Sequence, residues 1–287
     1  MRIDAHQHFL FPSRVSYPWL EGEALQPLQR DFGPEDLKSE LEQNTITHTI
    51  LVQTRSSLIE TREFLEIAAQ TPFVVGVVGW VDLTDPQVGL VLDALLEGPN
   101  GRFLVGIRHQ VHDEPDPLWL LRPDVNRGLE ALSARGLSYD LLVRVRELPA
   151  ALNTTRAHPD LTLVLDHMAK PEIKVGDLET WKHSLEPLAA LENVFIKLSG
   201  LVTEADWMTW TPEQIVPYFK VCLELFGPER CMYGSDWPVC LLASSYAQTL
   251  ELVVQALEGC GKKAVDAVLG GTAARAYRLK EHGLWQE

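Results

Sequence analysis

Long apolar runs are absent from this sequence of 287 residues. No uninterrupted apolar stretch approaches the roughly 20 residues that a helix needs to cross a bilayer, although 46% of the residues are hydrophobic. Basic residues are also scarce relative to acidic ones, 25 against 40, which gives a formal net charge of −15. This charge disfavours binding to nucleic acid or to an anionic membrane. The composition therefore predicts a soluble globular protein without such partners, in which an anionic substrate would need local arginines.

Cysteine is sparse, and its spacing fits no common metal or disulfide pattern. The residues Cys222, Cys231, Cys240 and Cys260 form no CxxC pair and are too few for a disulfide scaffold. We expect reduced, mostly packed thiols. The first residues also lack the basic, apolar and small-residue regions of a secretory signal peptide. Both features favour a cytoplasmic location.

Short apolar runs rich in Val, Ile and Leu alternate with longer segments of helical period, which is typical of a parallel sheet with helical crossovers. The runs that predict strands are 2–9, 49–53, 73–81, 103–109, 137–143, 161–167, 194–199 and 231–236. Helices are predicted, among others, at 34–43, 59–69, 125–134, 178–191, 211–226 and 246–258. No Gly/Ser/Pro-rich linker divides the chain. The sequence therefore predicts a single domain of the α/β class over residues 1–287, folded as a (β/α)8 TIM barrel.

The segment 10–31 interrupts this pattern directly after the first strand. It carries Phe11, Tyr17 and Trp19 but shows no clear periodicity, and structureless loops of this length are often functional. Two interpretations of these aromatic side chains remain open. They form a lid over the barrel mouth, or they form a contact between the subunits of a homo-oligomer.

Ionisable residues recur where the predicted strands end, and this end of a TIM barrel carries the active site. The first strand ends with His6 and His8, which strand alternation places on one face. A single His-x-His pair is a weak signal by itself. However, His167 ends the sixth strand and Asp236 the eighth, so a closed barrel would bring all four side chains together. We therefore predict that these four residues form the active site.

Four segments resemble the amidohydrolase superfamily. They are the His-x-His pair and the stretches 165–171 (LDHMAKP), 197–201 (KLSGL) and 233–238 (YGSDWP). The last two are typical of its lactonase branch, which includes L-fuconolactonase, L-rhamnonolactonase and, more distantly, pyrone-dicarboxylate lactonase. The stretches 106–110 and 113–117 are similar to the sugar-lactone members, and the likeness runs from residue 3 to about residue 279. The resemblance implies a hydrolase that opens a sugar lactone, such as L-fucono- or L-rhamnonolactone, to the aldonic acid.

The sequence departs from the binuclear members of this superfamily, which use a bridging carboxylated lysine and two further histidines. The fourth strand offers Arg108 and His109 in place of the lysine, and the fifth offers Asp140 in place of a histidine. The resemblance therefore implies one divalent ion, Zn²⁺, with open positions for water and substrate. The ligands implied for this ion are His6, His8 and Asp236. Because some lactonase relatives work without a metal, catalysis by protein groups alone remains an alternative.

Ester hydrolysis needs a base that activates water and a group that stabilises the developing oxyanion. We assign the first role to Asp236 and the second to His167, alone or together with the first-strand histidines. Contacts to the substrate are predicted from four further residues: Arg108, His109, Asp140 and Trp237.

Three neighbouring residues receive other interpretations. Asp4 precedes the histidine pair, and strand alternation places it on the same face as His6 and His8. We interpret Asp4 as a residue that anchors the strand through hydrogen bonds. His112 is interpreted as a loop residue. For Lys170, a substrate contact and a loop salt bridge both remain open.

Two other functions also remain open at this stage. One is a metal-dependent decarboxylase or amidase of the same superfamily, which the missing histidine of the fifth strand disfavours. The other is a non-catalytic binding protein with the same barrel, which the complete set of three histidines and one aspartate disfavours.

Overall fold

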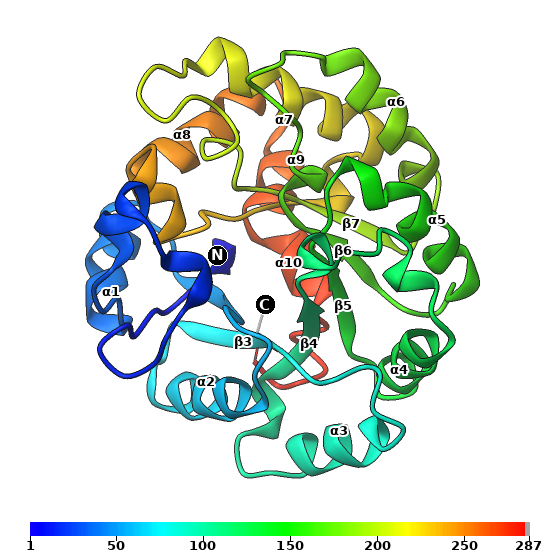
Figure 1. Cartoon of the computed structure of the whole chain (residues 1–287). Coiled ribbons are helices and arrows are strands. Elements are labelled where there is room, and N and C mark those ends of the chain that lie inside the picture. The colour runs from blue at the N-terminus through cyan, green and yellow to red at the C-terminus, as the bar shows by residue number, and fades with distance from the viewer. Residues whose placement is uncertain (285–287) are drawn as a thin grey trace.

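The structure is a computed structural model that describes residues 1–284. Eight parallel strands pair in chain order, and Figure 1 shows them at the centre with the helices around them. Their bounds are β1 (Ile3–Gln7), β2 (His48–Val52), β3 (Val74–Gly79), β4 (Leu104–His109), β5 (Ser138–Leu141), β6 (Leu163–Leu165), β7 (Val194–Leu198) and β8 (Cys231–Tyr233). Each strand overlaps the range predicted for it, and the (β/α)8 TIM barrel is confirmed.

The α-helices surround the strands as the sequence pattern predicts. Their bounds are α1 (Pro34–Gln43), α2 (Leu58–Gln70), α3 (Val88–Leu96), α4 (Pro123–Ser133), α5 (Leu148–Ala157), α6 (Leu178–Ala189), α7 (Pro212–Phe226), α8 (Tyr246–Ala256), α9 (Lys262–Asp266) and α10 (Thr272–Ala276). None of these helices is long and apolar enough to span a membrane, in the part of the chain that the structure describes.

Helices α3 and α5 lie where the sequence pattern named none. Helix α5 contains Asn153, Thr154 and Thr155, which are weak helix formers. The Thr155 hydroxyl donates within the helix, to the Ala151 carbonyl (2.7 Å). Packing supplies the missing stability, because both threonines are buried and the Thr154 hydroxyl donates to the Leu120 carbonyl outside the helix (3.2 Å). Tertiary contacts thus override a poor local propensity here.

The barrel closes between β1 and the segment that follows β8, not through β8 itself. The amide of Asp236 donates to the His6 carbonyl (2.8 Å), and the amide of His8 donates to the Trp237 carbonyl (2.7 Å). A parallel bridge joins Gln7 and Trp237. The backbone hydrogen bonds that close the barrel therefore hold Asp236 directly beside the two histidines of β1.

The carboxylate of Asp4 secures this closure. It accepts hydrogen bonds from the Ser235 amide (2.9 Å), the Ser235 hydroxyl (2.6 Å), the His6 amide (3.1 Å) and the Tyr246 hydroxyl of α8 (3.0 Å). Burial raises the pKa of Asp4 to about 6, although these hydrogen bonds lower it. The contacts support the interpretation of Asp4 as an anchor, but its carboxylate does not join the histidine side chains. Strand alternation would place Asp4 on the same face as His6 and His8. It does not hold here because the register of β1 against β2 shifts between Asp4 and Gln7.

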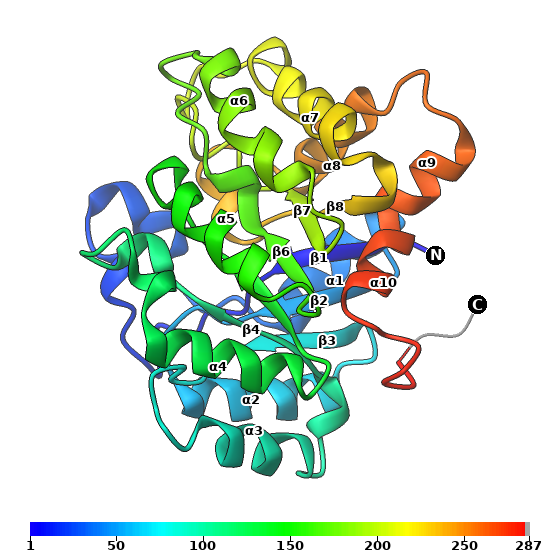
Figure 2. The ribbon, with the colours of Figure 1, turned by 90° about the vertical axis from the view of Figure 1, so that its right-hand side faces the viewer.

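The end of the barrel where β1 begins is covered by α10, as Figure 2 shows. Tyr277, directly after α10, is buried in one apolar cluster with Val105, Val164 and Met232 from three strands. This packing fills the end of the barrel interior where the strands begin. Access to the interior is therefore from the opposite end, where the strands finish.

The Asp4 anchor generates a stability prediction. Replacing Asp4→Ala leaves two buried amides and two hydroxyls without their acceptor, so we expect the free energy of unfolding to fall by about 3 kcal/mol or more. Tyr246→Phe removes one of the four donors and should cost about 1 kcal/mol. Urea unfolding followed by circular dichroism measures both. Equal losses for the two variants would contradict the anchoring role.

Candidate active site

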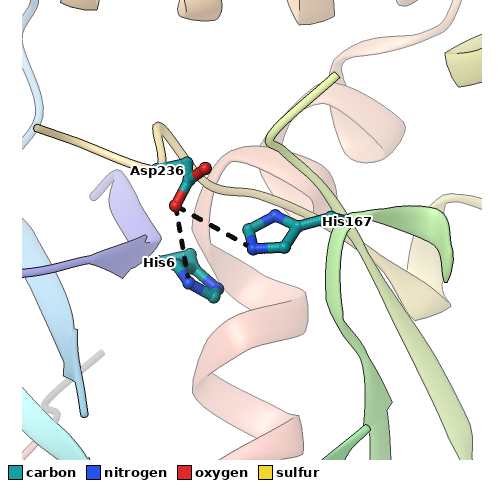
Figure 3. Close-up of side chains that lie close together, drawn as sticks. All are labelled: His6, His167 and Asp236. Atoms are coloured by element: carbon teal, nitrogen blue, oxygen red, sulfur yellow. Dashed lines mark ion pairs between the residues drawn. The ribbon is translucent and has the colours of Figure 1, made fainter. Parts of the chain in front are cut away.

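Three histidines, two at the end of β1 and one after β6, converge on one carboxylate at the open end of the barrel. Figure 3 shows His6 and His167 pointing toward Asp236. The Oδ1 atom of Asp236 lies 3.8 Å from Nε2 of His6, 3.4 Å from Nε2 of His8 and 3.9 Å from Nε2 of His167. The two Nε2 atoms of His6 and His8 are 3.2 Å apart. The structure thus brings together the four residues predicted for the active site.

An uncommon backbone conformation aims His167 into the site. Residues His167, Met168, Ala169 and Lys170 all have positive φ angles, between 49° and 58°, and this left-handed region costs a non-glycine residue about 1–2 kcal/mol. The Trp181 indole of α6 donates to the Met168 carbonyl (3.0 Å) and helps to hold the turn. Backbone strain of this kind clusters at functional sites.

Two residues of the segment after β7 fix the His167 ring. The Ser199 hydroxyl lies 2.9 Å from Nδ1 of His167. Gly200, with φ of +69°, leaves room for the ring, because a Cβ at this position would lie 2.4 Å from His167 Nδ1. The stretch 197–201, which carried part of the family resemblance, therefore supports His167.

Burial sets the protonation states of the cluster. Burial lowers the pKa of His6 well below its usual value and that of His167 to about 4. Burial alone would raise the pKa of Asp236, but the interactions with His167, His8 and His6 outweigh it and hold that pKa well below its usual range. At neutral pH, His6 and His167 are therefore neutral bases beside an ionised carboxylate.

The cluster has the donor set of a metal site. Its ligand atoms are imidazole nitrogens and a carboxylate oxygen, as Zn²⁺ prefers, and a tetrahedral ion with bonds of about 2.0–2.1 Å would separate them by about 3.3 Å. The separations from 3.2 to 3.9 Å fit this requirement. Nδ1 of His8 donates to the Val52 carbonyl (2.8 Å), which leaves its Nε2 as a free base. The ligand atoms of His6, His167 and Asp236 also lie within 4.8 Å of one another, so the His167 ring faces the same site.

A buried ionic network lies beneath the histidines, and we call it the interior quartet: Arg108, Asp140, Asp166 and Lys197. Nη1 of Arg108 lies 2.9 Å from Asp166 Oδ2, and Nζ of Lys197 lies 2.6 Å from Asp140 Oδ2 and 2.9 Å from Asp166 Oδ1. The two positive and two negative charges balance, which buried ions require. Burial raises the pKa of Asp140 to about 6, whereas Lys197, His6 and Arg108 together overcome the effect of burial on Asp166 and lower its pKa.

Sequence reasoning gave no role to Lys197 or Asp166. Lys197 is fully buried in β7, whose other residues are apolar, and lysine is almost never buried without a partner. A single lysine inside an apolar strand was therefore the available signal. Asp166 carries a weaker one, as an acidic residue between an apolar strand and His167.

The histidine cluster opens into a cavity of about 190 Å³ at the barrel mouth. Its lining residues are His8, Trp19, Thr54, Arg108, Gln110, His112, Asp113, Leu142, His167, Lys170, Asp236 and Val239. Trp19 comes from the segment 10–31, and its indole donates to the Thr54 carbonyl (3.2 Å). This segment therefore covers part of the mouth. His112, interpreted from the sequence as a loop residue, also lies on the cavity wall.

Of the four predicted substrate contacts, Arg108 lines this cavity and the other three do not. The His109 ring stacks on Trp119, with centroids 4.2 Å apart. The Trp237 indole is buried between Phe9 and Phe32. Asp140 lies deeper and bonds to Lys197 and Tyr277. These three side chains therefore lie away from the cavity wall, which strand-end position alone does not show.

Lys170 is held by a salt bridge, which supports its interpretation as a loop salt bridge over that as a substrate contact. Its Nζ lies 3.0 Å from Glu204 Oε1. It nevertheless borders the cavity, so a contact with the substrate is compatible with the same position.

Comparison with known proteins identifies the family. The model of the family described as amidohydrolase matches residues 3–279. The chain belongs to the amidohydrolase family. This amidohydrolase is 40% identical to an L-fucono-1,5-lactonase of Burkholderia multivorans, over 98% of the chain and 97% of that protein. It is 38% identical to the L-fucono-1,5-lactonase of Burkholderia ambifaria, over 97% and 96%.

Solved structures show the same relationship. The crystal structure of an amidohydrolase from Burkholderia multivorans with bound zinc superimposes with a TM-score of 0.91, at 39% identity, over 97% of this amidohydrolase and 99% of that chain. A probable 2-pyrone-4,6-dicarboxylic acid hydrolase from Acinetobacter baumannii, at 17% identity and a TM-score of 0.80, covers 96% of the chain and shares the fold. The family resemblance read from the sequence is confirmed.

The close approach of Gly200 to His167 generates a prediction. In Gly200→Ala, the new methyl group must displace the His167 ring, so we expect kcat/KM for a lactone to fall by about tenfold or more. Gly227→Ala is the matched control, because Gly227 has a similar φ of +73° but nothing lies within 4 Å of an added Cβ. The control therefore shows how much activity is lost through backbone strain at a positive φ when no clash is added. Loss of activity in both variants, or in neither, would contradict the positioning of His167 by Gly200.

Proposed function

We propose that this amidohydrolase opens a sugar lactone to its aldonic acid by attack of an activated water on the carbonyl. The observation that carries the proposal is the ionised Asp236 carboxylate, surrounded by three imidazoles at the wall of a closed-ended cavity. The full-length relatives that are L-fucono-1,5-lactonases support an aldonolactone as the substrate. The match to an L-rhamnono-gamma-lactonase of Scheffersomyces stipitis, 29% identical over 48% of the chain, supports the same class.

Asp236 serves as the base in this proposal. A carboxylate with a low pKa is a weak base, yet its placement against the reacting water matters more than its basicity when the leaving group is the alkoxide of a strained or activated ester. The carboxylate has two oxygens. Oδ1 faces the imidazoles, and a proton from water can be accepted at Oδ2. The proton then passes to the alkoxide that leaves when the ring opens.

His167 and Arg108 stabilise the negative charge that develops on the carbonyl oxygen. When the Ser199 hydroxyl donates to Nδ1 of His167, the ring proton lies on Nε2, which faces the site. Arg108 lines the cavity, and its Nη1 and Nη2 atoms are held by Asp166 and Gln53. A fixed cation and a fixed N–H group in a buried site stabilise an oxyanion without reorganisation.

We further propose one zinc ion, held by His6, His8 and Asp236. The separations between the ligand atoms of these three residues support it, as does the zinc bound to the Burkholderia multivorans relative. When bound, the ion would polarise the carbonyl and lower the pKa of a bound water. His167 then keeps its Nε2 proton for the oxyanion.

A cytoplasmic location is also part of the proposal. Cys222, Cys231 and Cys240 are buried free thiols, and Cys260 is an exposed one. Reduced thiols of this kind are typical of a reducing compartment.

The role of the base is tested by Asp236→Asn. The amide cannot accept the proton of water, so we expect kcat for aldonolactone hydrolysis to fall by about a hundredfold or more, with the fold retained. Release of a proton, followed with a pH indicator, measures the rate. Asp113→Asn is the control, because Asp113 also lines the cavity but is largely exposed, and its activity should stay close to wild type. Near-wild-type hydrolysis by Asp236→Asn would reject the assignment.

The metal site is tested by zinc binding. Protein dialysed against zinc should hold about one ion per chain by elemental analysis, and His8→Ala should weaken zinc affinity by about tenfold or more. His183→Ala, which alters an exposed imidazole on α6, should not change it. A second tightly held ion, or unaltered affinity in His8→Ala, would contradict the proposed site.

A further inference from the structure

His6 is fully buried, and both of its ring nitrogens face side chains with fixed hydrogen-bonding roles. Nδ1 lies 3.1 Å from Nζ of Lys197 and 3.4 Å from Oδ1 of Asp166. Nε2 lies 3.2 Å from Nη1 of Arg108 and 3.2 Å from Nε2 of His8. Lysine and arginine can only donate hydrogen bonds, whereas a neutral imidazole offers one donor and one acceptor. The ring therefore cannot satisfy both of its cationic neighbours at once.

The contacts of His8 and Lys197 favour one of the two positions of the His6 ring proton. Nδ1 of His8 must donate to the Val52 carbonyl (2.8 Å), so Nε2 of His8 is an acceptor. If His6 carries its proton on Nε2, it donates to this acceptor, and its Nδ1 accepts from Lys197. Every hydrogen bond along Lys197, His6, His8 and Val52 is then satisfied. Lys197 and His8 thus favour the Nε2–H tautomer of His6, whereas Arg108 and Asp166 favour the Nδ1–H tautomer.

A metal ion at the cluster requires the opposite tautomer. His6 must present a bare Nε2 to the ion, and its proton must then lie on Nδ1. Oδ1 of Asp166 lies 3.4 Å from that nitrogen and 2.9 Å from Nζ of Lys197, and within residues 1–284 it accepts no well-aligned hydrogen bond. A carboxylate oxygen has two lone pairs, so Oδ1 can face Lys197 and still accept a hydrogen bond from Nδ1 of His6. Carboxylate, imidazole and metal in this order form a common arrangement in metalloproteins.

We propose that Lys197 is a positioning residue that selects the tautomer of His6 and thereby opposes metal binding. In the metal-free protein, Lys197 donates to Nδ1, and Nε2 carries the proton. Zinc binding removes the Nε2 proton and places a proton on Nδ1, where Asp166 accepts it, so the ring stays neutral and no net proton is gained or lost. The inference rests on the metal site of the proposed function. It adds that the quartet sets how tightly the site holds an ion.

The first test is the metal affinity of a charge-balanced variant. Lys197→Met combined with Asp140→Asn removes one positive and one negative charge from the quartet and leaves Arg108 paired with Asp166. Without the competing donor, the Nδ1–H tautomer is favoured, so we expect zinc affinity to rise about tenfold. Titration of the folded protein against a chelating indicator measures this affinity.

Tyr277→Phe provides the matched control. It removes the hydrogen bond from the Tyr277 hydroxyl to Asp140 (2.8 Å) at the far end of the same network, without altering the neighbours of His6. A general loosening of the buried network would raise or lower zinc affinity in both variants. The proposal requires a change in the Lys197→Met/Asp140→Asn variant alone.

The second test reads the tautomer in the wild-type protein and does not depend on any variant that must fold. Nitrogen-15 spectra of labelled histidine distinguish a protonated from a bare ring nitrogen. We expect the His6 signals to show Nε2–H without metal and Nδ1–H with zinc. Nδ1–H in the metal-free protein, no tautomer change on zinc binding, failure of zinc to bind, or unchanged affinity in the folded double variant would each overturn the proposal. Absence of lactone hydrolysis alongside the expected spectra would reject only the proposed function.

Discussion

The closure of the barrel between β1 and the segment after β8 is the constraint on which the site depends. Two backbone hydrogen bonds, from Asp236 to His6 and from His8 to Trp237, join the first and last parts of the barrel. The residues that close the sheet are thus the residues that carry the chemistry. The buried Asp4 carboxylate fixes the same junction from outside the histidine cluster. Any loosening of this closure would separate the base from its imidazole neighbours.

Burial of the site has two consequences: it keeps two histidines neutral, and it requires every buried charge to be paired. It keeps His6 and His167 neutral, which leaves them free to bind a metal ion or to donate a hydrogen bond. It also removes charged side chains inside the barrel from water, so each of them needs a partner of opposite charge. The interior quartet meets that need with two cations and two anions. Because Lys197 and Arg108 also contact His6, the groups that neutralise the interior influence the metal site above them.

The sequence alone predicted the barrel and the convergence of the three histidines with Asp236. It succeeded because period-2 strands and helical crossovers leave a clear pattern, and because strand ends gather at one face of a TIM barrel. It did not show the direction in which individual side chains point. His109 turns to Trp119, Trp237 packs between two phenylalanines, and the shift in β1 register sends Asp4 to α8. The left-handed turn that aims His167 is likewise invisible, since none of its four residues is glycine.

The central claim is that Asp236 activates a water molecule and does not itself attack the lactone. Hydrolysis in ¹⁸O-labelled water over many turnovers, followed by mass spectrometry of the product and of the peptide that contains Asp236, tests it most directly. The account predicts label in the carboxylate of the aldonic acid and none in Asp236. Label in the Asp236 carboxylate would show a covalent acyl-enzyme, and label in the product hydroxyl would show cleavage of the alkyl–oxygen bond. Either result would contradict the account.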